Sequence, residues 1–328
     1  MNAKKVILGQ FFTQKNIWLR PHIRRFIRNS GCQIAYDPFA GNGDLLKVAA
    51  ALKLKTKGLD IDRKLGWIYN DSLLAVPSVK NAIIITNPPY ISNYSAARKK
   101  VLKDVKRYFV GSSYNDIYLI ALDKMLAAQE NVVAIIPETF INSAYQQKNR
   151  LHSITILEKN PFMDTDTPVV VACFNGKHKS LCRVKVYKND TFVDNLQSIE
   201  NKRLQPSHLI PIRFNTKRGW LGLRAIDLTD SKKDISFDYK SNIDYDWQKG
   251  IKVSSRLYSL IDIQIQEKYR KGFIKRANDI LKDLRRDTQD IILSPFKGNM
   301  KNGQRRRRLD FKTARAILEQ AYQFVNLG

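Results

Sequence analysis

The chain has 328 residues and a formal net charge of +27, because 57 lysine and arginine residues face only 30 aspartate and glutamate residues. Its hydrophobic content of 43% suffices for a large core and excludes disordered, collagen-like and coiled-coil proteins. No stretch approaches the roughly 18 apolar residues of a membrane span, and three cysteines cannot form a disulfide framework. The sequence therefore argues against membrane and secreted proteins and predicts a cytoplasmic one.

Short apolar strands alternate with helices over the first half of the chain. Strands are predicted at 32–36, in a segment ending at 62, and at 65–69, 82–85, 132–136 and 169–173, with helices at 44–54 and 116–129 and a basic loop between 90 and 116. Strands without polar alternation, separated by helices, indicate a sheet covered on both faces. The pattern predicts an α/β fold with a doubly wound, mostly parallel sheet.

From about residue 190 this alternation fades. Helices are predicted at about 255–270, 274–286 and 310–324, with a loop at 298–308. Residues 201–328 hold 28 basic and 14 acidic side chains, a net charge of +14, against +13 for residues 1–200 with 29 and 16. We therefore predict a catalytic domain at 1–194 and a basic, mixed and partly helical nucleic-acid-recognition domain at 195–328.

A glycine-containing loop, Asp37-Pro-Phe-Ala-Gly41-Asn-Gly43, joins a strand to a helix and lets a ligand approach the backbone closely. Asp60 lies 19 residues beyond Gly41, close to the spacing of about 20 at which an acid binds a ribose hydroxyl. The full three-glycine fingerprint of nicotinamide enzymes is missing, as is the Gly-Lys-Ser or Gly-Lys-Thr ending of a phosphate loop. The loop and the acid favour an adenosine-containing cofactor.

The tetrapeptide Asn87-Pro-Pro-Tyr90 follows the fully apolar strand. Its prolines end the strand and fix the backbone. The Asn87 oxygen and the Pro88 carbonyl can then accept both hydrogens of a conjugated amino group and free its nitrogen lone pair, while Tyr90 offers a flat surface to a planar target. The four residues alone could be a proline-rich strand exit. With Asp37, Asp60 and Asp71 also at strand ends, they indicate a catalytic site at one sheet edge.

These motifs together resemble the S-adenosylmethionine-dependent adenine-N6 DNA methyltransferases of restriction–modification systems. The resemblance covers about residues 6–175, and its motif order, with a C-terminal extension after the catalytic motif, is similar to the gamma-type arrangement. It implies a class I, Rossmann-like methyltransferase fold, S-adenosylmethionine as cofactor and double-stranded DNA as substrate, with a cognate restriction endonuclease as a further partner. It also implies that the target adenine is flipped out of the duplex.

The resemblance also implies roles for the matching residues. Those that would contact the cofactor are Thr13, Asp37, Phe39, Gly41, Gly43, Asp60, Asp71 and Ser72. Thr13 ends the segment Leu8-Gly-Gln-Phe-Phe-Thr13, which is similar to the family's closure over the methionine end of the cofactor, although Gln14 stands where the family usually has proline. Those that would act in catalysis are Asn87, Pro88, Pro89, Tyr90 and Phe162, the last where the family places an aromatic against the target base.

Two basic clusters are suited to DNA phosphates. One follows the tetrapeptide and the other is a run of four arginines; their residues are Arg98, Lys99, Lys100, Arg305, Arg306, Arg307 and Arg308. The arginine run could instead be a solvated charge run, or arginine stems lying over the helix predicted at 310–324, and the first cluster could be a solvated helix start. The four histidines are scattered and the cysteines lack Cys-x-x-Cys spacing, so no metal site is predicted.

Two other functions stay open on the sequence. Related tetrapeptides occur in enzymes that methylate RNA adenines or a glutamine amide of translation release factors; the Leu8–Thr13 segment and the basic second half favour DNA. The other alternative is an inactive nucleic-acid-binding specificity subunit, against which the intact tetrapeptide and glycine loop count.

Overall fold

The computed structural model describes residues 17–162, 165–230, 234–249 and 257–325, so the predicted cofactor contact Thr13 lies outside the described residues. The chain forms two compact units, Met1–Gln197 and Ser198–Gly328, which we call the N-terminal and the C-terminal unit. The roles of the two units in catalysis and recognition stay a prediction.

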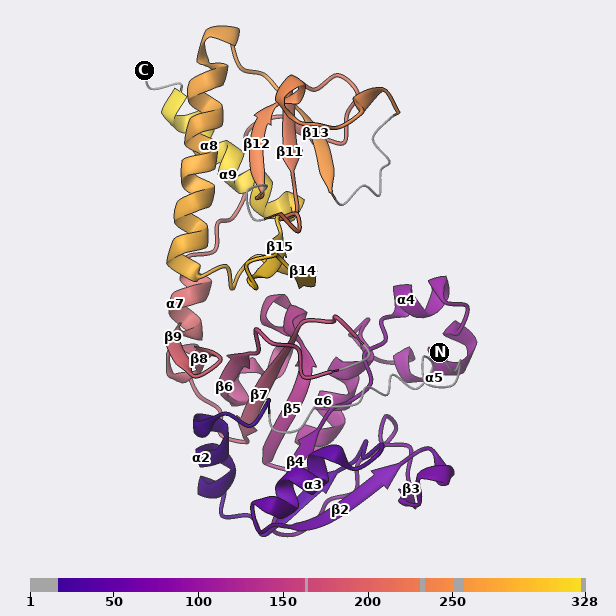
Figure 1. Ribbon diagram of the computed structural model, residues 1–328. Helices are drawn as coiled ribbons and strands as arrows, with labels where there is room; N and C mark the ends of the chain where they lie inside the picture. Colours follow the sequence, from indigo (N-terminus) through magenta and orange to yellow (C-terminus); the bar gives the residue numbers. More distant parts are fainter. Residues whose placement is uncertain (1–16, 163–164, 231–233, 250–256, 326–328) are drawn as a thin grey trace. The chain divides into compact units, whose positions relative to one another are not determined.

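The N-terminal unit is built on a nine-stranded sheet with the order β3-β2-β1-β4-β5-β7-β6-β8-β9 (Figure 1). Its strands are β1 (Ile34–Asp37), β2 (Lys55–Asp60), β3 (Ile68–Tyr69), β4 (Ala82–Thr86), β5 (Asn131–Pro137), β6 (Leu151–Ile156), β7 (Val169–Asn175), β8 (Lys185–Lys188) and β9 (Thr191–Asn195). Strands β1 to β5 are parallel, and β7 runs antiparallel between β5 and β6. The predicted α/β class with a mostly parallel sheet is confirmed.

The strand order of this sheet reverses between β1 and β4. Strand β1 leads to β2 on one side, whereas β4 pairs with the opposite side of β1, Ala35 lying beside Ile83. In open α/β sheets such a reversal leaves a crevice at the carboxyl ends of the two strands. The residues that directly follow β1 and β4 therefore face one another across that crevice.

Among the described residues, five helices belong to the N-terminal unit, and a sixth spans the division between the units. They are α2 (Pro21–Asn29), α3 (Asp44–Ala51), α4 (Asn93–Arg98), α5 (Leu102–Phe109), α6 (Ile117–Ala128) and α7 (Leu196–Asn201). Helix α2 starts with a proline in its first turn, where no amide hydrogen is needed. Helix α3 starts after Gly43, which adopts the left-handed conformation at φ +75°.

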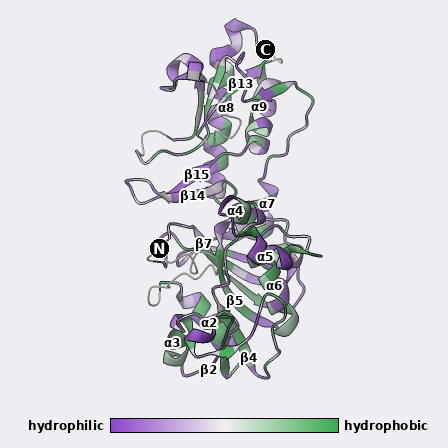
Figure 2. Ribbon diagram, turned by 90° about the vertical axis from the view of Figure 1, so that its right-hand side faces the viewer, coloured by the Kyte–Doolittle hydropathy of each residue, from purple (hydrophilic) through white to green (hydrophobic). Residues whose placement is uncertain are grey.

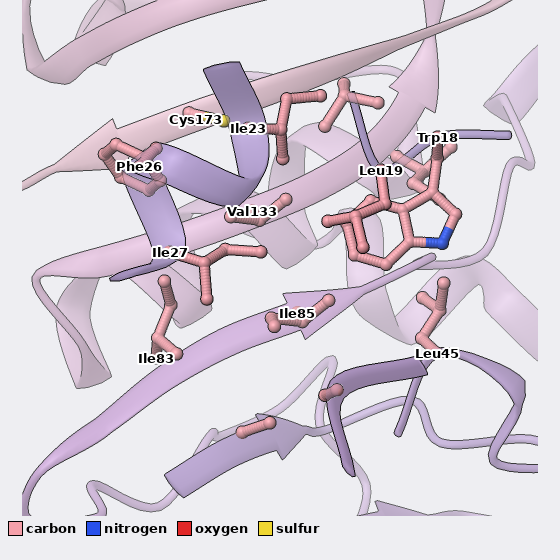
Figure 3. Packing of buried hydrophobic residues seen from close by; sticks show 14 of the residues in the cluster. Trp18, Leu19, Ile23, Phe26, Ile27, Leu45, Ile83, Ile85, Val133 and Cys173 are labelled. Carbon is pink, nitrogen blue, oxygen red and sulfur yellow. The ribbon is translucent and has the colours of Figure 1, made fainter. Parts of the chain in front are cut away.

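One hydrophobic cluster of this unit lies between the sheet and the pair α2 and α3 (Figure 3). On α2, Ile23, Phe26 and Ile27 recur at helical spacing and form one buried cluster with Ile85 of β4 and Val133 of β5. Each such side chain contributes roughly 1.5–3 kcal/mol when fully buried. The central strands are hydrophobic along their length (Figure 2), and every residue of β4 is buried. This rigid centre holds the strand ends that carry the predicted site.

The expectation of a loop between residues 90 and 116 is wrong, because this segment contains α4 and α5. A capping box opens α4, in which the Ser92 and Ser95 side chains each bond the other's backbone amide. Buried Ala96, Val105 and Tyr108 then join the two helices into a small cluster. Many charged residues separate these apolar positions and hide the helical spacing in the sequence. Helix α2 and strand β6 were also not predicted.

The C-terminal unit combines a four-stranded antiparallel sheet of order β10-β13-β11-β12 with a hairpin and two long helices (Figure 1). Its elements are β10 (Ile212–Phe214), β11 (Leu221–Arg224), β12 (Ser236–Tyr239), β13 (Tyr258–Ile263), α8 (Glu267–Thr288), β14 (Ser294–Asn299), β15 (Arg305–Arg308) and α9 (Phe311–Val325). Helices α8 and α9 pack against each other. Within the described ranges, no helix has the length and apolar character that crossing a membrane requires.

Two predicted elements of this unit are wrong. Residues 258–263, expected in a helix, form strand β13 at the centre of the sheet, where Ser259, Leu260 and Ile261 are buried. The segment 298–308, expected to be a loop, forms part of the β14–β15 hairpin. Gly298, at φ +74°, lies where the register of β14 shifts, and Gly303, at φ +85°, lies in the turn between the strands. The helix predicted at 310–324 is confirmed as α9.

Candidate active site

A pocket lies at the carboxyl ends of β1, β2 and β4, where the strand order reverses. Eight residues singled out from the sequence line it: Asp37, Phe39, Gly41, Asp60, Asp71, Ser72, Asn87 and Pro89. Helix α5 completes the wall with Asp104, Val105, Arg107 and Tyr108. Gly43, Pro88, Tyr90 and Phe162 are not part of this lining.

The glycine loop is held in shape by the carboxylate of Asp60. The Gly41 amide donates to Asp60 Oδ2 and the Asp62 amide to Oδ1, both at 2.8 Å. The Trp67 indole N–H donates to the Gly41 carbonyl at 2.8 Å. A β-carbon at Gly43 would stand 2.8 Å from Trp67 Cζ2, so Gly43 is required for packing behind the pocket. Asp60 is thus a structural clamp on the loop as well as part of the wall.

Asp37 is buried at the base of the pocket, with 1% of its surface exposed. Its Oδ1 accepts from Thr86 Oγ1 at 2.6 Å and from the Phe39 amide at 3.0 Å. Burial raises the pKa of this carboxyl from 3.8 to about 7, and the nearby Asp60 carboxylate adds to the rise. A cation bound beside Asp37 would favour its ionised form.

Asp71 lies at the opposite wall and contacts two residues that the sequence did not single out. Its Oδ2 accepts from Arg107 Nη2 and from the Tyr108 hydroxyl, each at 2.9 Å. Both donors stand on α5, within the segment expected to be a loop. No local pattern marks them, because their position depends on how α5 packs. The neighbouring Ser72 is buried and accepts from Asn70 Nδ2 at 2.8 Å.

The tetrapeptide lies at the carboxyl end of β4. The Tyr90 hydroxyl is within hydrogen-bonding distance of Asn87 Oδ1 and 2.7 Å from the Ile135 carbonyl, and it can donate to one of them at a time. Burial raises the pKa of Tyr90 well above its usual value, so the hydroxyl stays a donor. The Tyr90 and Phe162 ring centroids are 6.1 Å apart at 63°. A base stacked between two rings requires the rings to be parallel. In this edge-on arrangement one ring would have to rotate before a base could stack between them.

The two predicted phosphate-binding clusters differ in exposure. Arg98, Lys99 and Lys100 are exposed at the end of α4. The run Arg305–Arg308 is strand β15, whose side chains alternate, and Arg305 and Arg307 are buried at 6% and 1% exposure. These two arginines offer no surface to a phosphate, which corrects the expectation for them.

The half-buried arginines of β15 are also engaged within the unit. Arg306 Nε donates to the Asp227 carbonyl at 2.8 Å, and its guanidinium lies 4.9 Å from the centroid of the Phe296 ring. Among the described residues, no group of three or more His, Cys, Asp or Glu side chains is arranged to hold a metal ion.

Residues 57–164 match the family model described as Eco57I restriction-modification methylase. The resemblance to a restriction–modification methyltransferase is confirmed. The matched segment contains Asp60, Asp71, the tetrapeptide and Phe162, and it takes in α5 with Arg107. No curated protein matches the chain.

Solved structures similar to this chain share little sequence with it. A putative class I S-adenosylmethionine-dependent methyltransferase from Listeria monocytogenes is 13% identical to this chain. The match covers 54% of this chain and 65% of the Listeria protein, with a TM-score of 0.39. A type I restriction-modification system methyltransferase subunit from Streptococcus thermophilus is 16% identical over 59% of this chain and 53% of its own, with a TM-score of 0.39. A putative RNA methyltransferase from Pyrococcus horikoshii is 16% identical over 53% and 91%, with a TM-score of 0.35.

The chain therefore spans less than two thirds of the length of the first two of these proteins. All three TM-scores are below 0.5, too low to relate the substrates of those proteins to this chain.

Proposed function

We propose that the protein is a site-specific DNA methyltransferase that transfers a methyl group from S-adenosylmethionine to the N6 amino group of adenine, as the modification enzyme of a restriction system. The observation that carries this proposal is the position of Asn87. It follows the buried strand β4 beside β1 and lines the same pocket as Asp37, Asp60 and Asp71. In that position the side-chain oxygen of Asn87 can accept a hydrogen bond from a substrate amino group beside the cofactor pocket.

The pocket residues fit S-adenosylmethionine. A sulfonium cation would favour the ionised form of the buried Asp37 carboxyl, whose pKa burial raises to about 7. Gly41 lines the pocket at φ +52° without a side chain, so a ligand can approach the backbone of the loop. Asp60 and Asp71 supply acceptors for hydroxyl and amino groups. When bound, S-adenosylmethionine supplies an activated methyl group.

The residues of the chain would prepare the acceptor nitrogen. Asn87 Oδ1 and the Pro88 carbonyl accept the two hydrogens of the target amino group, which frees the nitrogen lone pair. The Tyr90 hydroxyl then donates to the Ile135 carbonyl and leaves Asn87 to the substrate. The Tyr90 and Phe162 rings hold the flipped base once they turn parallel. Positioning the reacting atoms within about 3–3.5 Å supplies much of the acceleration, so no general base is required.

Charge supports DNA as the macromolecular substrate. The net charge of +27 favours a polyanion. The exposed cluster Arg98–Lys100 begins eight residues after the tetrapeptide, at the C-terminal end of α4. Its cations would contact the phosphates of the strand that carries the target base.

The test is methyl transfer from labelled S-adenosylmethionine to mixed genomic DNA, with total RNA and the variant Asn87→Ala in parallel. The wild type should place label in DNA as N6-methyladenine. Asn87→Ala should lose at least about 100-fold in turnover, the order typical for removal of one preorganised polar group, while its Kd for the cofactor changes little. Label in RNA alone would overturn the substrate, and no label in either nucleic acid would point to a protein acceptor or to an inactive binding subunit. Loss of cofactor binding in Asn87→Ala would contradict the role of Asn87.

A further inference from the structure

Asp71 is held by two donors that meet at one of its two carboxylate oxygens. Arg107 Nη2 and the Tyr108 hydroxyl lie 2.9 Å from Oδ2, and Arg107 Nη2 also donates to the Tyr108 oxygen at 2.7 Å. The three groups therefore form a closed triangle. In the part of the chain that the structure describes, no donor reaches Asp71 Oδ1.

Two hydrogen-bond donors on a single oxygen restrict the rotation of a carboxylate. Rotation about the Asp71 side chain would break both bonds to Oδ2, one of which involves the charged guanidinium of Arg107. Asp71 lies in the pocket wall with 12% of its side chain exposed, whereas 59% of the Arg107 side chain is exposed. The triangle thus restrains Asp71 through Oδ2, with donors that line the same pocket, and leaves Oδ1 able to accept a hydrogen bond from a ligand.

The two donors are anchored by the packing of α5. Tyr108 and Val105 are buried in one cluster with Ile91 and Ile117. Ile91 directly follows the tetrapeptide, and Ile117 begins α6. The Arg107 guanidinium also lies 4.8 Å from the centroid of the Tyr108 ring. Packing of the Tyr108 ring in this cluster therefore fixes the position of its hydroxyl, and the contact with the Tyr108 ring fixes the Arg107 guanidinium.

We propose that Arg107 and Tyr108 are positioning residues that aim Asp71 Oδ1 at the exocyclic amino group of the cofactor's purine, and that this triangle makes the site select a 6-aminopurine over a 6-oxopurine. This inference rests on the proposed function, because it assumes that the pocket holds an adenosine cofactor. An ionised carboxylate only accepts hydrogen bonds. A 6-amino group donates to it, whereas a 6-oxo group brings a second acceptor against it. A fixed carboxylate enforces that difference, and a mobile one can turn away.

The experiment titrates S-adenosylhomocysteine and S-inosylhomocysteine into the full chain by calorimetry, without DNA. The two ligands differ at the purine 6-position, and neither carries the transferable methyl group. The wild type should prefer S-adenosylhomocysteine by about 100-fold or more, because the 6-oxo group of S-inosylhomocysteine leaves the Asp71 carboxylate without a hydrogen-bond donor. In the double variant Arg107→Met, Tyr108→Phe the preference should fall below about tenfold, mainly through weaker binding of S-adenosylhomocysteine.

Matched variants separate positioning from structure and from charge. Lys106→Met removes one cation from the exposed side of the same helix and should leave the preference unchanged. Arg107→Lys keeps a cation and should restore part of the preference. Tyr108→Phe keeps the buried ring and loses only the hydroxyl. Thermal melting of each variant verifies that α5 remains folded.

Turnover offers an independent readout. In the double variant, KM for S-adenosylmethionine should rise about tenfold with kcat nearly unchanged, because Asn87 and Pro88 are untouched. A double variant that keeps the wild-type preference would overturn the positioning role while leaving the proposed function intact. A wild type that binds neither ligand would overturn the proposed cofactor and this inference with it. The titrations contain no nucleic acid, so an error in the proposed substrate leaves their result standing.

Discussion

The carboxyl group of Asp37 shows how far a single residue can depart from its behaviour in water. The pKa is 3.8 for an ordinary aspartate and about 7 at this buried position. A raised pKa means that the folded state holds the proton more tightly than the unfolded chain does. The resulting stability is fully present below pH 3.8 and is lost as pH rises through about 7. The ligand-free protein should therefore weaken toward neutral and alkaline pH.

The variant Asp37→Asn should remove this dependence, because asparagine stays neutral and keeps an acceptor for Thr86. The difference in unfolding free energy between variant and wild type should grow from about pH 4 to pH 7 in the variant's favour. It should level off near 4 kcal/mol, because the pKa rises from 3.8 to about 7 and each pKa unit corresponds to about 1.36 kcal/mol. Urea unfolding at pH 5, 6, 7 and 8 measures it. If the unfolding free energies of the two proteins changed with pH in parallel, the raised pKa of the buried Asp37 carboxyl would be contradicted.

The sequence predicted the residues of the pocket wherever their motif is local. Asp37, Asp60 and Asn87 each stand at a strand end, and Gly41 lies in the loop that follows β1. Strand ends and such loops can be located from apolar runs and from glycine or proline. It could not predict Arg107 or Tyr108, since their contact with Asp71 requires α5 to fold back over the pocket. The same limit explains the arginine run, because only the tertiary structure determines which charges become buried.

Among the elements, α8, β15 and the segment after β11 are joined at one buried carboxylate. Asp227 is fully buried and accepts both Arg285 Nη1 and Nη2, at 2.8 and 3.0 Å, together with the backbone amides of Ile235 and Arg307 at 3.0 and 2.9 Å. Arg285 also bonds Asp290 at 2.8 Å. This network ties the backbone of the arginine strand to α8.

Arg285→Met should destabilise the C-terminal unit by about 3–5 kcal/mol, because it leaves the buried Asp227 charge without its partner. The control Arg286→Met, one residue along α8, removes a side chain that is 66% exposed and bridges only surface aspartates. Its cost should be much smaller, because ion pairs between exposed side chains contribute little to stability. Urea unfolding followed by circular dichroism measures both. Equal costs for the two variants would show that the Asp227 network does not stabilise the unit.

At the scale of the whole molecule, the basic charge is shared by both halves of the chain, with +13 over 1–200 and +14 over 201–328. Binding of DNA should therefore release many counterions. A protein with 6–10 phosphate contacts loses about 10³–10⁵ in affinity between 50 and 200 mM salt. A loss of that order is expected here and can be measured by fluorescence anisotropy with a labelled duplex.

The triple variant Arg98→Ala, Lys99→Ala, Lys100→Ala should lower the slope of log affinity against log salt by about 3, one for each phosphate that the variant no longer neutralises. Asn87→Ala should leave that slope unchanged, because it removes no cation. A triple variant with the wild-type slope would place the phosphate contacts elsewhere on the chain.

The overall architecture of the N-terminal unit could be predicted because its strands are buried on both faces and read as apolar runs. The C-terminal unit could not be predicted to the same extent. Its strands are short, and β13 carries mixed polar and apolar residues that resemble a helical pattern. Its strand pairings join distant segments, such as Leu221 of β11 with Ile261 of β13, which no local sequence signal records.

The N-terminal unit is continuous in the chain and ends at Gln197. Its last strand, β9, ends at Asn195, so every partner in the nine-stranded sheet is available before the C-terminal unit is synthesised. Domains generally fold as units during translation, at about 5–20 residues per second. The sheet that carries the pocket can therefore close on the ribosome some seconds before the last of the 28 basic side chains in residues 201–328 emerge beside ribosomal RNA.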